Sequence, residues 1–362
     1  MKKVTFWLLI IICICTLSLA ESPVENQSKS APGNEQIILL SFVGDCSIGD
    51  AFQFVNYDSC YHATIREKGY AWPFSTALKY TQSDDLTIAN LEVVFTNRTR
   101  RSDKRFNLIG APDHVQCLID GSVEMVNTVN NHAMDFYVEG YRDSLATLDG
   151  AGVKHFGTVY PGNKNGSDIY PIVEVKGVNI GFIGFTYPQE SDLKRIEYRI
   201  DELKKQGCDL IVVSLHWGRE THMTPQHWQY AFAKKVINLG ADLIWGHHPH
   251  VLQPIHFYKG KPIMYSTGNF TFGTMSKVDP STGIFQFTYQ KGDDGIQLSK
   301  MQVIPYQTQH GPEYRPLELT EPALQQEVFS KLRFKKEIEG FENLPPSFLE
   351  NGIVYFKQGI MQ

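Results

Sequence analysis

The sequence has no excess of basic residues. Its 34 Lys and Arg are outnumbered by 39 Asp and Glu, and the formal net charge is −5. A domain that follows nucleic-acid phosphates needs a positive surplus, so we do not expect this chain to bind nucleic acid. There is also no internal repeat and no low-complexity segment. With 42% hydrophobic residues in 362, the chain can form one large α/β domain with a tail, or two domains of ordinary size.

Cysteine is scarce, and its spacing does not suit a metal. The six cysteines form no C-x-x-C pair, which argues against a zinc site built from thiolates. The four that follow residue 20 can form disulfides in three connectivities or remain buried free thiols, and the sequence does not choose between these states. They are Cys46, Cys60, Cys117 and Cys208.

The longest apolar run is confined to the N-terminus. It begins after Lys2 and Lys3, reaches Leu19, and is followed by small and then polar residues. This order predicts a signal peptide over residues 1–20 that is cleaved after Ala20. An uncleaved anchor is the alternative, because the run is near the lower limit of ~17 residues for crossing a bilayer. In either case we expect an exported protein that is periplasmic, secreted or membrane-anchored, with a polar linker over residues 21–36.

Apolar runs then alternate with helix-like stretches, which indicates α/β architecture with covered sheets. In the helix-like stretch 226–241, Trp228, Phe232, Val236 and Leu239 have the spacing of one apolar helix face. The predicted strands are 37–45, 86–92, 123–132, 178–186, 209–218, 241–248 and 262–270, and the other predicted helices are 140–152 and 195–208.

The pattern changes after about Gly273. An alternating stretch predicts a β-hairpin around the turn Gly-Asp-Asp-Gly, and residues 310–362 are predicted to be helical in their middle. We therefore divide the chain into a main domain, 37–273, and a C-terminal β extension with a helical tail, 274–362.

Polar residues fall where the predicted strands end. Because the carboxyl ends of parallel strands emerge at one edge of a sheet, we expect these side chains to converge on one site. The residues concerned are Asp45, Asn90, Glu92, Asn130, Asn131, His132, His216, His247, His248 and His250.

Each signal also has an ordinary interpretation, such as a turn at Gly-Asp, a helix cap at Asn-Leu-Glu or a satisfied buried His216. The run His-His-Pro-His is the strongest, since histidines two apart across Pro249 are expected to extend to the same side of a stiff backbone, as metal ligands would. We assign His222, His227 and His256 to the surface or to packing, with a His222–His227 metal pair as a weaker rival.

Taken together, the candidates favour a metal centre. Carboxylate, amide and imidazole ligands in one set suit Mn, Fe or Zn better than Mg or Ca, which prefer oxygen ligands alone. About seven candidates exceed what a single tetrahedral ion needs. We therefore expect two divalent ions.

The ordered series GDCSIGD, DLTIANLE, NNHAMDFYVEGYRDSL, SLHWGRE, GHHPHVLQP and STGNFTFG, which spans about residues 38–273, resembles the CapA family of poly-γ-glutamate capsule biosynthesis proteins. The domain of that family is similar to the calcineurin-like metallophosphoesterases. The resemblance implies a two-sheet α/β/β/α sandwich of the metallo-dependent phosphatase type, with a dinuclear site at the strand ends. It implies that His132 faces the leaving group as general acid, and that the metal ligands are Asp45, Asn131, His216, His248 and His250.

Two departures separate the chain from metallophosphoesterases. Ser47 stands where their opening motif has a histidine, and Asn90-Leu91-Glu92 stands where they have a bridging aspartate. Glu92 is our candidate for the missing carboxylate and a metal ligand. The remaining residues expected to bind substrate or support the ligands are Asn90, Asn130, Asp135, Glu220, His247 and Asn269.

Two functions follow from the resemblance. One is a metal-dependent hydrolase that acts on a phosphoester or a polymer amide. The other is a non-catalytic accessory protein that binds, tethers or helps export an anionic polymer, with a membrane-bound polymer synthase as partner. The basic run RTRRSDKR at 98–105 is a candidate polymer contact, although such a run is more often a solvated loop.

Overall fold

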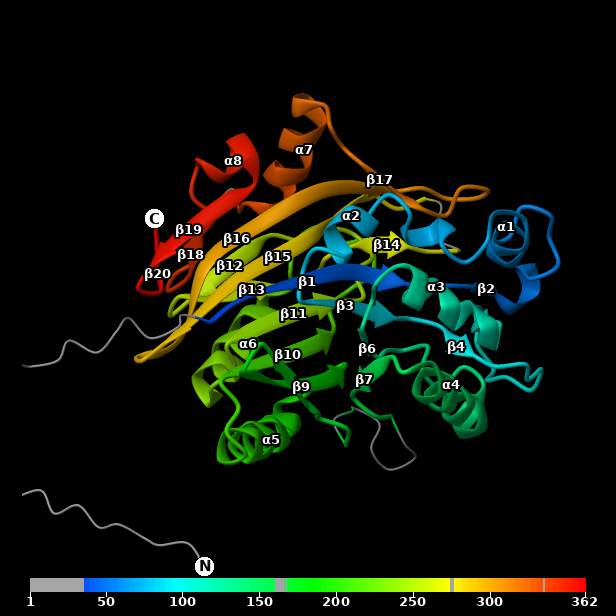
Figure 1. Cartoon of the computed structure of the whole chain (residues 1–362), viewed down its shortest axis with the longest axis horizontal. Helices are drawn as coiled ribbons and strands as arrows, with labels where there is room; N and C mark the ends of the chain where they lie inside the picture. The colour runs from blue at the N-terminus through cyan, green and yellow to red at the C-terminus, as the bar shows by residue number, and fades with distance from the viewer. Residues whose placement is uncertain (1–35, 160–165, 167, 274–276, 335) are drawn as a thin grey trace, which may run out of the picture. The chain divides into compact units, whose positions relative to one another are not determined.

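In the computed structural model, two β-sheets lie face to face with an apolar core between them (Figure 1). Residues 36–362 are described, apart from 160–165, 167, 274–276 and 335. The predicted signal peptide and all but the last residue of the linker lie outside the described residues. Phe42 of the first sheet meets Trp245 of the second with ring centroids 5.3 Å apart, in a core cluster to which both sheets contribute.

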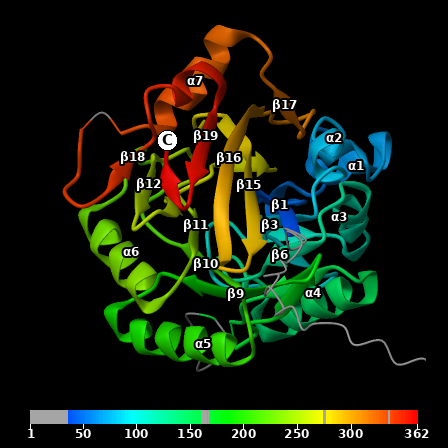
Figure 2. The same ribbon diagram turned by 60° about the vertical axis from the view of Figure 1, so that its left-hand side comes forward.

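The first sheet has ten strands, and its long hairpin crosses the molecule beside β1 (Figure 2). The strand order is β20-β19-β16-β15-β1-β3-β6-β7, with β14 on β1 and β17 on β16. The bounds are β1 Gln36–Cys46, β3 Leu86–Leu91, β6 Met125–Asn127, β7 Lys154–Phe156, β14 Asn269–Thr271, β15 Ser281–Gly292, β16 Gly295–Thr308, β17 Pro316–Glu318, β19 Ile353–Lys357 and β20 Ile360–Met361.

The second sheet has seven strands in the order β18-β12-β13-β11-β10-β9-β8, and a small third sheet has the order β2-β5-β4. The bounds are β8 Ile172–Val175, β9 Val178–Thr186, β10 Leu210–His216, β11 Leu243–His247, β12 Ile255–Tyr258, β13 Lys261–Met264 and β18 Glu342–Asn343, then β2 Asp50–Ala51, β4 Val94–Phe95 and β5 Leu108–Gly110.

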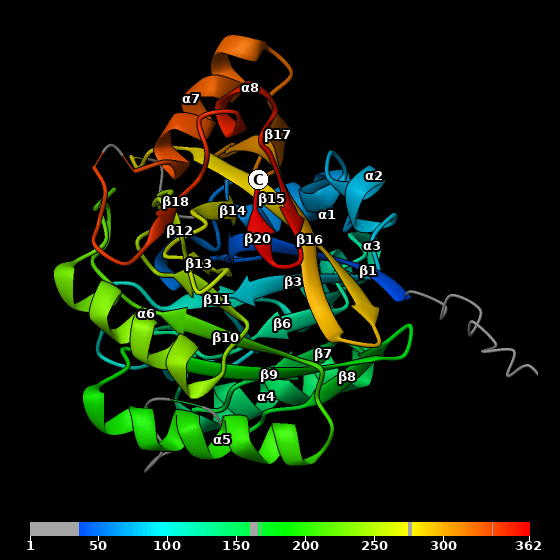
Figure 3. The same cartoon turned by 90° about the vertical axis from the view of Figure 1, so that its left-hand side faces the viewer.

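Helices cover the outer face of each large sheet. Figure 3 shows α5 and α6 side by side against β9, β10 and β11, and residues of both helices join one core cluster with those strands. α1, α3 and α4 contribute to the cluster on the outer face of the first sheet. The bounds are α1 Tyr61–Lys68, α2 Leu78–Thr81, α3 Gln116–Asp120, α4 Tyr137–Ala151, α5 Leu193–Lys205, α6 His227–Leu239, α7 Pro322–Leu332 and α8 Phe348–Asn351. The predicted α/β/β/α sandwich is confirmed.

The predicted hairpin is also confirmed, because β15 and β16 pair antiparallel around Gly292 and Gly295. β15 in turn pairs with β1, so the hairpin forms part of the first sheet. The helical middle of the tail is α7, whose Val328 and Phe329 pack into the core cluster between the sheets. Among the described residues, every helix is too short or too polar to cross a membrane.

Three local predictions are wrong in part. The run 123–132 is a strand only over Met125–Asn127, because the Asn127 side chain bonds the backbone at Val129 and the chain turns. The run 262–270 divides into β13 and β14, which belong to different sheets. On α6, Trp228 is 41% exposed, because Gln229 is the residue turned inward to cap the helix.

Candidate metal centre

The register of the first sheet aligns polar side chains at its carboxyl edge. β1 and β3 are parallel, with Asp45 opposite Asn90, and β6 follows with Asn127 opposite Asn90. On the other side of β1, Asp45 is opposite Asn269 of β14. Figure 1 shows the arrowheads of β1, β3, β9 and β10 pointing the same way. The polar ends of these strands therefore meet, as expected for parallel strands.

This alignment requires a glycine beside Asp45. The Asp45 backbone N–H donates to the carbonyl of Gly268 at 2.8 Å, which brings β14 against β1. A Cβ atom on Gly44 would lie 2.1 Å from that same carbonyl oxygen. Any larger residue at position 44 would therefore push β14, and Asn269 with it, away from the site.

In the second sheet, β10 and β11 end with His216 opposite His247. The chain then turns through His248 and His250, which have φ values of 95° and 57°. The two imidazoles therefore reach the same site from a turn. Positive φ in a residue other than glycine costs of order 1–3 kcal/mol and is concentrated at functional sites.

Glu92 lies at the centre of the cluster. Its side chain is fully buried, and its Oε1 atom accepts no hydrogen bond from the described residues. Three imidazole Nε2 atoms surround this oxygen, at 3.7 Å for His216, 3.8 Å for His250 and 4.0 Å for His132. These distances are too long for hydrogen bonds. Glu92 Oε1 lies from His216 and from His250 at a separation that suits two atoms bound to the same ion, given ligand distances of about 2.0–2.2 Å.

Asp45 is also fully buried and is surrounded by donors. Its Oδ1 accepts from Asn90 Nδ2 at 2.7 Å and lies 3.1 Å from His247 Nδ1, while its Oδ2 lies 3.3 Å from His250 Nδ1. Asn90 in turn accepts from Asn127 at 2.8 Å, so its amide orients the carboxylate. Asn90 and His247 thus contact the Asp45 carboxylate from two sides of the cluster.

His216 faces Asn131, whose Oδ1 lies 2.7 Å from His216 Nε2, the atom that also faces Glu92. His250 Nδ1 donates to Asn269 Oδ1 at 2.8 Å. Two overlapping sets of side chains could hold a metal ion, and both contain Glu92. They are Asp45, Glu92 and His216, and Glu92, His248 and His250.

His132 is part of a dyad at the edge of this cluster. Its Nδ1 lies 2.6 Å from Asp135 Oδ2, so the ring is oriented with Nε2 toward Glu92. Lys104 donates to Asp135 Oδ1 at 2.7 Å and also to the carbonyl of Asn131. His132 keeps 14% of its side chain exposed, so it can meet both solvent and the buried cluster.

The buried charged groups of the cluster shift one another's pKa values. Burial by itself would raise the pKa of Asp45, but His247 and His250 hold that pKa well below its usual value. Burial raises the pKa of Glu92 well above its usual value. Burial would lower the pKa of His250, yet Glu92 and Asp45 raise it to about 9. Two adjacent carboxylates that resist joint ionisation favour a bound cation.

Asn130 and Glu220 are two further residues that the sequence predicts for the site. Asn130 accepts from the His132 backbone N–H and donates to the Leu91 carbonyl, so it fixes the turn that carries His132. Glu220 is exposed, and its carboxylate makes no contact within hydrogen-bond distance in the described part of the chain, although its charge helps raise the pKa of Glu92.

Sequence reasoning missed two members of the site. Tyr187 directly follows β9, has a φ of 44°, and places its hydroxyl 3.2 Å from His248 Nε2. Asn127 lies within the predicted strand 123–132, and its side chain donates to Asn90. Their positions at the carboxyl ends of parallel strands were the available signal, but Tyr and a lone Asn are too common there to be singled out.

Other features lie outside this cluster. The four cysteines are free thiols. His256 is buried and stacks on Phe334, with centroids 4.0 Å apart, while His222 and His227 are exposed. Asp50, Cys60 and His62 also form a possible metal group, but Asp50 already accepts the backbone N–H groups of Tyr61 and His62 at the start of α1.

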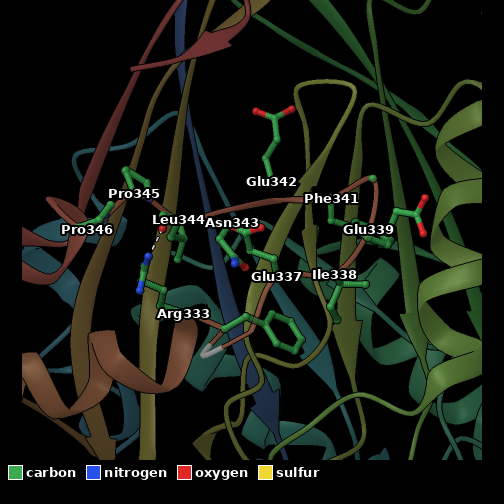
Figure 4. Close-up of a pocket in the computed structure, with 12 residues that line it drawn as sticks. Arg333, Glu337, Ile338, Glu339, Phe341, Glu342, Asn343, Leu344, Pro345 and Pro346 are labelled. Carbon is green, nitrogen blue, oxygen red and sulfur yellow. Dashed lines mark hydrogen bonds between the residues drawn. The ribbon is translucent and has the colours of Figure 1, made fainter.

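Residues 333–334 and 337–346 line a cavity of about 840 Å³ (Figure 4). Arg333 closes one side of it by donating to the Leu344 carbonyl at 2.9 Å. None of the predicted site residues lines this cavity, so it is separate from the metal centre.

Residues 39–274 match the model of the bacterial capsule synthesis protein family PGA_cap. This chain belongs to that family. The PGA biosynthesis protein CapA of Bacillus subtilis is 29% identical to it over 278 residues, which cover 72% of this chain and 70% of the relative. The capsule biosynthesis protein CapA of Bacillus anthracis is 27% identical, covering 86% and 78%. A probable polyglutamine synthesis accessory protein of Mycobacterium tuberculosis is 25% identical, covering 55% and 59%.

Among solved structures, this PGA_cap protein is similar to a hypothetical protein from Thermus thermophilus, with a TM-score of 0.45 and 15% identity over 74% of this chain and 99% of that one. It is also similar to the sulfate thiohydrolase SoxB of Thermus thermophilus, with a TM-score of 0.40 and 14% identity over 77% and 56%.

Proposed function

We propose that this protein is an exported, metal-dependent hydrolase of poly-γ-glutamate capsule biosynthesis. The observation that carries the proposal is the environment of Glu92 Oε1. This buried carboxylate oxygen accepts no hydrogen bond from the described residues, and three imidazole nitrogens lie 3.7–4.0 Å from it. A buried polar atom left without a partner costs about 1–3 kcal/mol, which a cation at this position would offset. Export rests on the predicted signal peptide.

The ligand set fits two divalent ions. Asp45 and His216, with Asn131, would hold one, and His248 and His250 would hold the other; Glu92 belongs to both sets and would be a ligand in either. Carboxylate, amide and imidazole ligands favour Mn, Fe or Zn. Ions bound there would polarise a substrate oxygen and lower the pKa of a water molecule toward ~7.

Glu92 takes the place of the bridging aspartate that metallophosphoesterases carry. Ser47, which stands in the position of their first-motif histidine, is buried, and its Oγ accepts the backbone N–H of Gly273 at 2.8 Å. It is therefore occupied in holding the end of β14 and adds no ligand.

His132 is the group that would transfer the proton. Asp135 accepts from its Nδ1 and fixes the tautomer, which leaves Nε2 free to hold or donate a proton at the reacting atoms. Lys104 and the Leu108 backbone N–H, at 2.7 Å each, keep Asp135 oriented. The substrate would be a phosphoester or, by extension, an amide of the polymer, since both reactions need a polarised oxygen and an activated water.

The test combines metal analysis with turnover. We expect about two equivalents of Mn, Fe or Zn in the purified mature protein by elemental mass spectrometry, and their loss in a His248→Ala, His250→Ala double variant. His132→Ala should keep the metal and the fold but lose hydrolysis of phosphoesters or polyglutamate. Wild-type protein that stays folded without metal and does not take up Mn or Zn would overturn the proposal.

A second function is favoured by the burial of the site. Glu92 and His216 are fully buried, and His248 and His250 are 5% and 2% exposed, which leaves little ligand surface for a substrate. A metal-stabilised accessory protein that binds or tethers an anionic polymer, beside a membrane-bound synthase, needs no such access. In that case His132→Ala would lower metal content or melting temperature, and no turnover would be found in the wild type.

A further inference from the structure

The loop that joins β4 to β5 carries a concentrated positive charge in an acidic protein. Residues 98–105 hold five basic residues and one aspartate, whereas the whole chain has a formal charge of −5. Two of the five have acidic partners: Arg98 binds Asp143 at 2.7 Å, and Lys104 binds Asp135. The other three, Arg100, Arg101 and Arg105, pair with no carboxylate in the described part of the chain, and all are exposed.

Each of these three arginines instead lies over an aromatic ring. The guanidinium carbon is 4.8 Å from the Tyr137 ring centroid for Arg100, 4.1 Å from that of Phe52 for Arg101, and 5.0 Å from that of Phe106 for Arg105. A ring beneath a guanidinium group restrains it while its N–H groups can still bind an anion. Arg101 uses one of these groups, because its Nη1 donates to the Thr99 carbonyl at 3.3 Å. Three exposed arginines on one loop, none of which pairs with a carboxylate among the described residues, favour an anionic ligand.

The loop is fixed to the metal centre. The Ser102 backbone N–H donates to the Asp135 carbonyl at 2.8 Å, and Asn107 Nδ2 donates to Ser102 Oγ at 2.8 Å. Lys104 reaches both Asp135 and the backbone of Asn131. The loop that carries the arginines is thereby held next to the His132–Asp135 dyad.

A hollow of about 480 Å³ lies along the same loop. Its lining includes Arg98, Arg100 and Tyr137, with Glu139 as the one acidic residue. The hollow can take part of a flexible chain, with Arg100 in its wall, while Arg101 and Arg105 lie on the same loop outside it.

We propose that Arg100, Arg101 and Arg105 form a binding surface for a polycarboxylate chain, poly-γ-glutamate in particular, that leads into the metal centre. The inference rests on the proposed function, which supplies the polymer. Arginine binds carboxylate through two parallel N–H groups, so a repeated carboxylate matches a row of stacked arginines. We name the three residues the arginine row.

The experiment measures binding of fluorescein-labelled poly-γ-glutamate to the full mature protein by anisotropy, from low to physiological salt. The test variant is Arg100→Gln, Arg101→Gln, Arg105→Gln. The control removes the same charge from exposed lysines on other elements, with Lys154→Gln, Lys194→Gln and Lys357→Gln. We expect binding by the test variant to be at least about tenfold weaker at low salt, with a shallower salt dependence, and the control to bind like the wild type.

Equal binding by all three proteins, or no binding by the wild type, would overturn the arginine row, whereas the proposed function depends on metal content and turnover. Binding of poly(glycerol phosphate) instead of polyglutamate would overturn the polycarboxylate assignment in favour of a polyphosphate. If the glutamine variant does not fold, Arg→Lys at the same positions keeps the charge but loses the planar fork. That variant should bind more weakly than wild type, and equal binding would refute the arginine-specific contact.

Discussion

Replacing Glu92 by Gln should separate the role of this residue in metal binding from its role in the fold. The side chain is fully buried, and Oε1 has no hydrogen-bond partner among the described residues, so the amide removes a charge that burial disfavours while keeping the volume. Because the pKa of Glu92 is raised in the folded state, the carboxylate destabilises the metal-free protein at pH 7. This cost disappears as the pH falls toward the pKa that Glu92 has in the unfolded chain. We therefore expect metal-free Glu92→Gln to be about 1–2 kcal/mol more stable than wild type at pH 7.

The effect of metal should have the opposite sign. Loss of the shared ligand is expected to weaken metal binding by about 100-fold or more. Mutating a residue that only supports a metal ligand already weakens binding about 10–100-fold, and loss of the ligand itself should cost at least as much. At a metal concentration of about 100 times the wild-type Kd, wild type gains about 2.7 kcal/mol and the variant about 0.4 kcal/mol. At about 2 °C per kcal/mol, the metal-induced rise in Tm falls from about 5 °C to about 1 °C.

The assay is thermal unfolding with EDTA and with Mn²⁺, together with metal content by mass spectrometry. Glu124→Gln is the matched control, because both Glu124 carboxylate oxygens accept hydrogen bonds, from the Thr87 backbone N–H and from Ser122 Oγ, at 2.8 Å each. It should lose about 1–3 kcal/mol without changing the response to metal. If Glu92→Gln keeps the full response to metal, or if its metal-free form loses more than about 3 kcal/mol, the reasoning is refuted.

Four further predictions concern the same site. Asp135→Asn should lower kcat about 10²- to 10⁴-fold with metal content unchanged, because His132 loses the partner that sets its tautomer; an unchanged kcat would show that the dyad has no part in turnover. Burial would lower the pKa of His250, but neighbouring carboxylates raise it to about 9, so its contribution to metal-free stability should be complete below about pH 6.5 and lost as the pH rises through 9, in chemical denaturation with EDTA. Metal affinity should rise over that same window as the proton leaves, and an affinity independent of pH would contradict this. Tyr187→Phe should weaken metal binding about 10-fold or more, measured by competition with a chelator, because His248 loses its hydroxyl partner; unchanged affinity would leave Tyr187 as a surface residue only.

The sequence predicted the strand ends well because one physical rule governs them. Buried parallel strands read as continuous apolar runs, so the first polar residue after each run marks the carboxyl edge of a sheet. Asp45, Asn90, His216 and His247 lie where this rule puts them. The rule failed for Asn127, which looks like one more strand residue but belongs to the polar edge, since its neighbour in register is Asn90.

Contacts between distant segments could not be read from the sequence. Lys104 lies in a basic loop, and only the packing of that loop on the turn after β6 puts its ammonium group beside Asp135. Trp228 has the spacing of a buried helix position, yet it is exposed. The buried residue at this point of the helix is its neighbour Gln229, whose side chain caps the helix. Such outcomes depend on which side chains compete for one place, and that competition exists only in the folded chain.

The sequence by itself determined the alternation of strands and helices, the hairpin after residue 280, the side chains able to bind metal and the family resemblance, because periodicity and local chemistry are properties of short segments. Only the tertiary structure decided that Glu92 belongs to two possible ligand sets, that His132 is paired with Asp135, and that the four cysteines are free. These are distances between residues far apart in the chain, and they are fixed by the sheet register and by close approaches such as Gly44 against Gly268.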